Sequence, residues 1–142
     1  MTVINGIRQY MATCPLLQSL NTKGKIDFLG EAVNSYSIEP VPDNPVVENW
    51  IGGGGIRQYS FTVAIKFDYS NEAQMNIENS GFFEKLESWI KEQNRIGNMP
   101  DLGEGKVATS LVTTSTGYLY GVTPDMRSGR YQISCRLLYE EY

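Results

Sequence analysis

The feature that most constrains the fold is an uninterrupted alternation of side-chain type over residues 56–69. One face carries Tyr59, Phe61, Val63, Ile65, Phe67 and Tyr69, and the other carries Ser60, Thr62, Lys66 and Asp68 around Ala64. A period of two is typical of a β-strand with one buried face. At about 3.3 Å per residue this strand is unusually long, and its apolar face needs a covering layer.

Four consecutive glycines, Gly52 to Gly55, separate this strand from a shorter segment, Val46 to Ile51. The arrangement predicts a β-hairpin with the glycines at its tip. A phosphate-binding loop is the alternative, but it requires a Lys-Ser/Thr pair at its end and a helix after it. Because Ile56 begins a strand instead, we interpret the glycines as a flexible tip, which also suits a surface that becomes ordered against a neighbouring protein.

Two regions have helical periodicity. Residues 2–13 carry apolar side chains at helical spacing, with Thr2 as N-cap and Pro15 marking the end. A second region begins at Ser70 or Asn71, and its later part has an apolar stripe. The stripe consists of Phe82, Phe83, Leu86, Trp89 and Ile90. Asn79-Ser80-Gly81 interrupts the early part, so the structure of residues 70–81 stays open.

The other segments predict extended structure. Short extended segments are expected at Lys25–Leu29 and Ser35–Ile38, and strands at Lys106–Thr116 and Arg130–Tyr139. Residues 117–122 either continue the first of these strands or begin a turn. Three prolines in residues 39–45 remove three backbone donors, so this stretch predicts an extended connection over the surface and not a central strand.

These elements predict an α+β fold: a two-layer domain with a mostly antiparallel sheet, built from two hairpins packed against two helices. The 142 residues fit a single domain spanning residues 1–142. The alternating aromatic residues also raise the possibility of a base-stacking RNA-binding sheet. Because basic residues do not accompany them and the second helix needs a partner surface, core packing is favoured.

The balance of 12 basic against 16 acidic residues gives a net charge of −4. It does not favour binding to nucleic acid or to anionic membranes. Neither a signal-peptide pattern nor an apolar stretch of about 18 residues is found, so we expect a soluble protein made in the cytoplasm. Cys14 and Cys135 are expected to be buried thiols there, with a disulfide as the alternative.

The sequence offers no catalytic constellation. It contains no histidine, which removes the commonest general base, the Ser-His and Cys-His pairs and the histidine-based metal sites. Asp101 and Glu104 share a glycine-rich loop, but with no partner base nearby a solvated loop is the simpler interpretation. We therefore predict a protein that is not an enzyme and that has no cofactor and no metal.

Short strings distributed along the chain carry a family resemblance. They are Cys14-Pro15-Leu16, Asp27-Phe28-Leu29-Gly30, Tyr36-Ser37-Ile38, Arg57-Gln58-Tyr59-Ser60-Phe61, Asn76-Ile77-Glu78-Asn79-Ser80-Gly81-Phe82, Trp89-Ile90, Gln93-Asn94, Leu102-Gly103, Gly117-Tyr118-Leu119 and Arg130-Tyr131-Gln132-Ile133. In this order the chain resembles the small tail-terminator, or minor capsid, proteins of long-tailed bacteriophages that infect Gram-positive hosts. The resemblance covers nearly the whole chain, and its weight comes from order and coverage.

The resemblance implies a virion structural protein with a tail-terminator-like fold. Proteins of this family form a hexameric ring that caps the last ring of tail-tube protein, stops tube polymerisation and joins the tail to the head-connector protein. The implied location is the head-proximal end of the tail. DNA passes through the lumen, and an acidic wall suits this passage because basic residues would hold the phosphates. No catalytic residue, sequence-specific nucleic-acid contact or membrane contact is implied.

A cyclic ring is held by heterologous contacts, in which one surface meets a different surface of the next copy. We predict interface residues at Gly52, Gly53, Gly54, Gly55 and Arg57, and in the loop with Asn98, Asp101 and Glu104. The alternatives are another head–tail joining or tail-tube subunit of similar fold, or a small enzyme or ligand-binding module. A tube subunit polymerises into long stacks, and a module needs a deep polar pocket with facing carboxylates.

Overall fold

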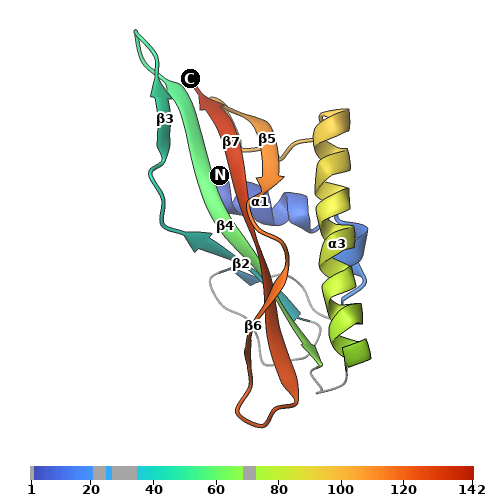
Figure 1. Ribbon diagram of the computed structural model, residues 1–142. Coiled ribbons are helices and arrows are strands. Elements are labelled where there is room, and N and C mark those ends of the chain that lie inside the picture. The colour runs from blue at the N-terminus through green and yellow to red at the C-terminus, as the bar shows by residue number, and fades with distance from the viewer. Residues whose placement is uncertain (1, 21–24, 27–34, 69–72) are drawn as a thin grey trace.

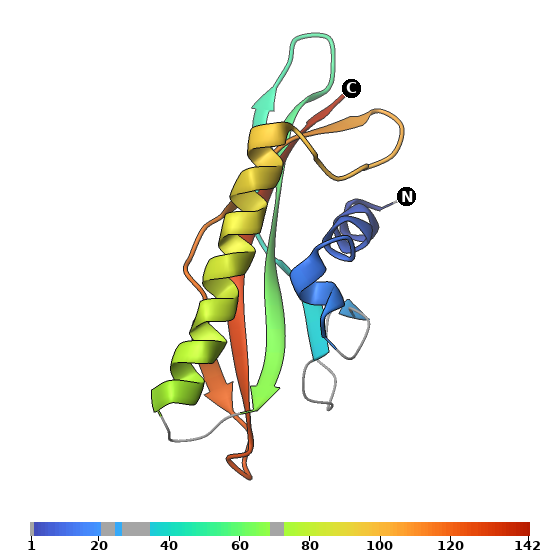
Figure 2. The ribbon, with the colours of Figure 1, turned by 90° about the vertical axis from the view of Figure 1, so that its right-hand side faces the viewer.

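The computed structural model describes residues 2–20, 25–26, 35–68 and 73–142. These residues form a mixed α+β fold, as predicted, with a seven-stranded sheet and helices on one of its faces (Figures 1 and 2). Six of the strands pair antiparallel, and β1 pairs parallel with β2.

The centre of the sheet is a ladder of two long strands. The strands are β1 (Lys25–Ile26), β2 (Ser35–Val41), β3 (Val46–Asn49), β4 (Gly55–Asp68), β5 (Lys106–Thr113), β6 (Tyr118–Val122) and β7 (Ser128–Glu141). β4 and β7 have 14 residues each and pair along their whole length, from Gly55 opposite Glu141 to Asp68 opposite Ser128. β2 and β3 flank β4, while β5 and β6 flank β7. The long strand expected from the alternation is therefore present, although Tyr69 lies outside the described residues.

The core lies between the sheet and the three helices, α1 (Val3–Met11), α2 (Pro15–Gln18) and α3 (Ala73–Ile96). Phe61, Val63 and Ile65 of β4 are fully buried, and Phe83 and Leu86 of α3 belong to the same cluster. Full burial of a large apolar side chain contributes about 1.5–3 kcal/mol. The aromatic face of β4 is thus a packing surface, as its alternation favoured.

The N-terminal helix begins and ends close to its predicted bounds. The Thr2 hydroxyl accepts the N–H of Asn5 at 3.2 Å, which is the expected cap. After Met11 the chain turns, and Pro15 occupies the first position of the short α2, where a missing N–H is harmless. Tyr10 packs against Trp89 of α3, with ring centroids 5.5 Å apart, so α1 is fixed to the long helix.

The structure answers the question that the sequence left open for the second helix. α3 is continuous over 24 residues, and Asn79-Ser80-Gly81 does not interrupt it. A glycine inside a helix costs only about 1 kcal/mol, and the apolar stripe that follows offsets this. The proposed caps, Ser70 and Asn71, lie outside the described residues.

The proline-rich stretch differs in part from its prediction. Glu39, Pro40 and Val41 belong to β2, with Pro40 opposite Phe61, so the predicted connection is confined to residues 42–45. A proline is tolerated here because the described part of the chain pairs β1 with β2 only at Ser37 and Ile38, so among the described residues Pro40 has a strand on one side alone. The expected strand at Lys25–Leu29 is seen as β1, and residues 27–34 lie outside the described part.

The C-terminal strands also differ in extent from the expectation. β5 ends at Thr113, and residues 118–122 form a separate strand, β6, beside the other end of β7. Asn94 of α3 covers the outer edge of β5, because its side chain accepts the N–H of Leu111 at 2.9 Å and donates to the carbonyl of the same residue. This contact occupies backbone hydrogen-bonding groups on the outer edge of β5, which would otherwise be open to another strand.

Candidate protein interface

Three segments distant in the sequence meet at one end of the β4–β7 ladder. They are the β3–β4 hairpin tip, the end of the loop before β5, and the end of β7 (Figure 1). The Trp50 and Tyr142 rings lie 5.4 Å apart, and the Tyr142 N–H donates to the Gly105 carbonyl at 2.8 Å. We call this region the tip end.

The four glycines of the hairpin serve two different structural needs. A Cβ atom on Gly54 would overlap the carbonyl of Glu141, and one on Gly55 would overlap the carbonyl of Glu48. These two glycines allow β7 and β3 to approach closely. Gly52 and Gly53 have φ angles of +92° and +107°, and an added Cβ would meet nothing within 4 Å, so only their backbone conformation requires glycine.

Ile51 stands at the apex of the hairpin. The Gly53 N–H donates to the Trp50 carbonyl at 3.3 Å, and the positive φ of Gly52 is that of the third residue of a type II turn. This turn places Ile51 at its second position with a relative exposure of 107%. The fold therefore gains no packing energy from this side chain.

Arg57 serves the hairpin itself. Its Nη1 donates to the carbonyls of Glu48 and Ile56 at 3.1 and 3.3 Å. These bonds stiffen the base of the tip across β3 and β4. Arg57 belongs to the tip end, and its observed contacts are internal.

The loop after α3 divides into a structural and an exposed part. The Asn98 carbonyl accepts the Tyr10 hydroxyl at 2.8 Å, and the Asp101 carboxylate accepts the N–H of Gly103 at 2.9 Å. Leu102 is buried in the core. Asn98 and Asp101 therefore hold the loop in place beside α1, whereas Glu104 is exposed near the tip end.

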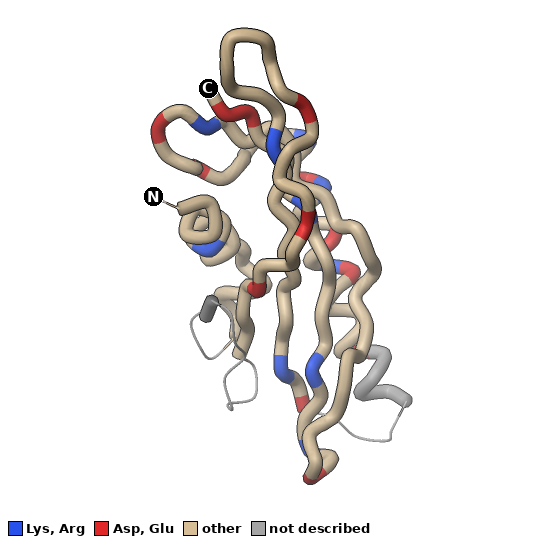
Figure 3. The backbone as a smooth tube through the Cα atoms, turned by 90° about the vertical axis from the view of Figure 1, so that its left-hand side faces the viewer, with Lys and Arg blue, Asp and Glu red and all other residues tan. Residues whose placement is uncertain are grey.

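The tip end is acidic. Glu48, Glu104, Glu140 and Glu141 lie on its segments, against only Arg57 and Lys106 (Figure 3). Toward the other end of the ladder, Lys66, Arg127 and Arg130 lie near Asp68 and Asp125, and Arg130 is paired with Glu39. The two ends of the molecule thus differ in charge.

Exposed apolar residues also lie at that other end, which was not predicted. Tyr118, Leu119, Tyr120 and Met126 have exposures of 42%, 40%, 65% and 54%. Met126 has a φ of +61° in the turn between β6 and β7, where Asp125 accepts the Thr123 hydroxyl at 2.5 Å. The clue in the sequence is the apolar string Tyr118-Leu119-Tyr120, which by itself indicates only a strand or a turn. We call this region the β6 end.

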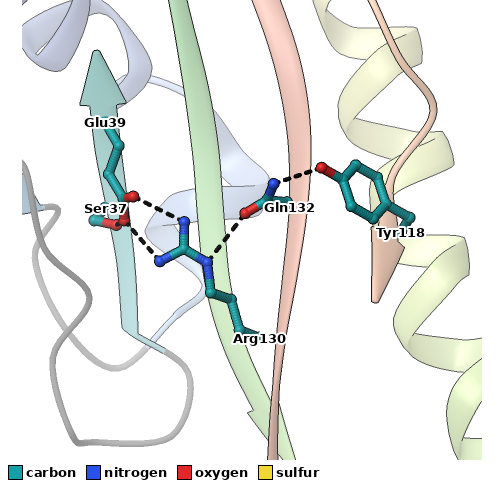
Figure 4. Close-up of polar contacts among 5 residues, drawn as sticks. All are labelled: Ser37, Glu39, Tyr118, Arg130 and Gln132. Carbon is teal, nitrogen blue, oxygen red and sulfur yellow. Dashed lines mark hydrogen bonds and ion pairs between the residues drawn. The ribbon is translucent and has the colours of Figure 1, made fainter. Parts of the chain in front are cut away.

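A polar network crosses the face of the sheet opposite the helices (Figure 4). Arg130 of β7 donates to both carboxylate oxygens of Glu39 on β2, at 2.8 and 3.1 Å. Its side chain passes over β4 at the small residue Ala64, and its Nε donates to Gln132 at 3.0 Å. Gln132 in turn donates to the Tyr118 hydroxyl at 2.5 Å. The network fixes β6 and β2 to the central ladder.

Neither the two thiols nor the grooves described next show an arrangement typical of a catalytic site. Cys14 and Cys135 are free and buried, as expected, and burial raises the pKa of Cys135 to about 12, so a reactive thiolate is disfavoured. Two open grooves of about 280 and 440 Å³ lie beside residues 40–45 and between α2 and α3. Neither brings two carboxylates together. In the described parts of the chain, no three His, Cys, Asp or Glu side chains are grouped to hold a metal ion.

The sequence matches no protein-family model, and the comparison with curated proteins gave no match. Among the described residues, no helix combines the length and apolar character needed to cross a membrane.

Proposed function

We propose that this chain is a structural subunit of a phage tail terminator, with a tail-terminator-like arrangement of two hairpins against helices. In this role it forms a ring, expected to be a hexamer, that caps the tail tube and joins it to the head connector. The observation that carries the proposal is the placement of exposed apolar residues at both ends of the ladder. Ile51 and Tyr142 lie at one end, and Tyr118, Tyr120 and Met126 lie at the other.

Apolar side chains at two opposite ends of the molecule suit a subunit that contacts one partner at each end. Tyr and Met are enriched in the centres of interfaces. An enzyme or ligand-binding module would instead concentrate such residues in a pocket. The family resemblance supplies the identity of the two partners, and the acidic tip end accords with a wall that does not retain DNA.

The test is to purify the chain and mix it with tail tubes assembled from the tube protein of the same genome. Analytical ultracentrifugation gives its mass alone, and electron microscopy shows whether one ring caps each tube end. A single closed ring on tube ends is the expected result. A chain that never binds tube ends sinks the proposal, and a chain that polymerises alone into long stacks identifies a tube subunit instead.

A further inference from the structure

The face of the sheet opposite the helices, the open face, carries a cation that the fold leaves unpaired. Arg136 of β7 lies on this face because side chains alternate along a strand, and Arg130 and Gln132 of the same strand lie there too (Figure 4). In the described part of the chain, the Arg136 guanidinium donates no hydrogen bond and joins no ion pair, and its Nε is buried without an acceptor. A buried donor without an acceptor is unfavourable, so an anion from outside the chain would stabilise it.

A matching anion lies further along the same face of the same strand. Past Arg136, the next open-face side chains of β7 are Leu138 and Glu140, and all three are partly exposed. The Glu140 carboxylate accepts the Tyr142 hydroxyl, and among the described residues it pairs with no cation. Arg136 and Glu140 are about 13 Å apart along the strand, and their side chains do not meet within one chain. The strand therefore presents a positive, an apolar and a negative side chain in a row.

We propose that the open face packs against the same face of a second copy of this chain, as two sheets pack in a sandwich, in a contact centred on Leu138. A two-fold axis at Leu138, perpendicular to the strands, makes the two β7 strands antiparallel and places Arg136 of each copy opposite Glu140 of the other. Stacked sheets lie about 10 Å apart, a gap that arginine and glutamate side chains bridge from opposite sides. Parallel strands would instead place like charges opposite each other, which is unfavourable.

The neighbouring strand β5 supports the same arrangement. Val112 of β5 lies beside Arg136 in register, and Val107 lies beside Glu140. The axis that pairs the charges therefore also brings Val112 of each copy to Val107 of the other. These valines are 37% and 52% exposed, so their contact removes apolar surface from water. One symmetry operation thus matches both the charges and the apolar side chains.

This inference goes beyond the proposed function. A ring is held by heterologous contacts, whereas the contact proposed here joins the same surface of two copies and closes with two. It describes the chain free in solution, before it meets a tube end. Its failure leaves the proposed function intact, because that function is tested by binding to tube ends.

Sedimentation equilibrium of the full chain over a range of concentrations measures the dimer dissociation constant. The variants are Arg136→Glu and Glu140→Arg, and the matched control is Glu84→Arg, which reverses an exposed charge on α3. Each of the two variants alone places like charges opposite each other at both contacts. We therefore expect its dissociation constant to rise roughly tenfold or more, while the control dimerises like the wild type.

The decisive measurement mixes the two variants, with a fluorescent label on one of them. In the mixed dimer both positions are acidic on one copy and basic on the other, so attraction returns at both contacts. We expect the dissociation constant of the mixture to return to within about threefold of the wild-type value, and the double variant Arg136→Glu/Glu140→Arg to dimerise by itself.

Circular dichroism verifies that each variant is folded. A wild-type chain that stays monomeric up to about 1 mM overturns the inference. Single variants that dimerise like the wild type overturn it as well, because the charges then do not face each other. A mixture and a double variant that both stay monomeric overturn the antiparallel two-fold arrangement, and the inference with it.

Discussion

At the scale of single residues, the pair formed by Arg130 and Glu39 connects strands that are not neighbours. The guanidinium reaches across β4, and Ala64 beneath it is fully buried. A larger side chain at position 64 would block this path. Because the two side chains are only 28% and 20% exposed, the pair is less screened by solvent than a surface ion pair.

Glu39→Ala should lower the free energy of unfolding by about 1–3 kcal/mol, because Arg130 loses its charged partner in a part-buried position. Urea unfolding followed by fluorescence measures the effect. The matched control is Glu92→Ala, which removes an exposed pair with Arg95 on α3 and should change stability much less, because solvent screens that pair. Equal losses in the free energy of unfolding for the two variants would show that the Glu39–Arg130 pair stabilises the fold no more than an exposed ion pair does.

Buried acidic groups make the fold sensitive to alkali. Burial raises the pKa of Tyr10 and of Cys135 to about 12, from ordinary values of 10.0 and 9.0, and also raises that of Cys14. Between the ordinary and the raised values, the folded chain holds more protons than the unfolded chain. The stabilisation is therefore fully present below about pH 8 and is lost as the pH rises toward 12.

The urea midpoint should accordingly stay constant between about pH 7 and 8 and fall steadily between about pH 9 and 11. Cys135→Ala removes one of the contributing groups, so its midpoint should fall less steeply with pH than that of the wild type, whatever its value at neutral pH. A wild-type midpoint that is flat up to about pH 11 would falsify this account.

At the scale of elements, two glycines near α3 have opposite environments. Gly81 lies inside the helix with nothing within 4 Å of an added Cβ, whereas a Cβ on Gly117 would overlap the Phe83 side chain. Gly81→Ala should therefore raise the free energy of unfolding by about 0.5–1 kcal/mol, because alanine has the higher helix propensity. Gly117→Ala should lower it by about 1–3 kcal/mol through overpacking.

Thermal unfolding of the two variants measures both effects under the same conditions. The pair forms its own control, since each variant adds the same single methyl group. If Gly81→Ala destabilises the chain, the continuous helix through residues 79–81 is wrong.

Local patterns were enough to predict most elements, and tertiary contacts explain what was missed. The alternation in β4 and the apolar stripe of α3 predicted both elements because their periods reflect burial directly. The continuity of α3 at Gly81 and the extension of β2 through Pro40 were missed, since packing on the sheet overrides local propensity there. The tip was predicted from its glycines, but the β6 end was not, because exposure of Tyr120 and Met126 depends on the separation of β5 from β6.

At the scale of the whole molecule, the chain is a bar with two unlike ends. The tip end combines an apolar apex with acidic surroundings, and the β6 end combines tyrosines and Met126 with charges of both signs on Asp125, Arg127 and Arg130. A subunit between two different partners needs such a difference, because identical ends would not distinguish the tube from the connector. The exposed tyrosines and Met126 are of the residue types that dominate interface energies or adapt to partner surfaces.

In the proposed role as a tail terminator, changes at the two ends should disable different junctions. The double variant Tyr120→Ser/Met126→Ser should weaken one junction roughly tenfold or more, while Ile51→Ser weakens the other. Electron microscopy of mixtures with tubes and connectors counts capped tube ends and head-joined tails for each variant. The matched control is Val112→Ser, an exposed apolar residue of β5 that lies away from both ends of the ladder. Because the Arg130 guanidinium lies 5.1 Å from the Tyr120 ring centroid, the stability of the double variant is measured first. Loss of the same junction by both variants would show that both ends contact one partner. It would contradict a subunit that lies between two different partners.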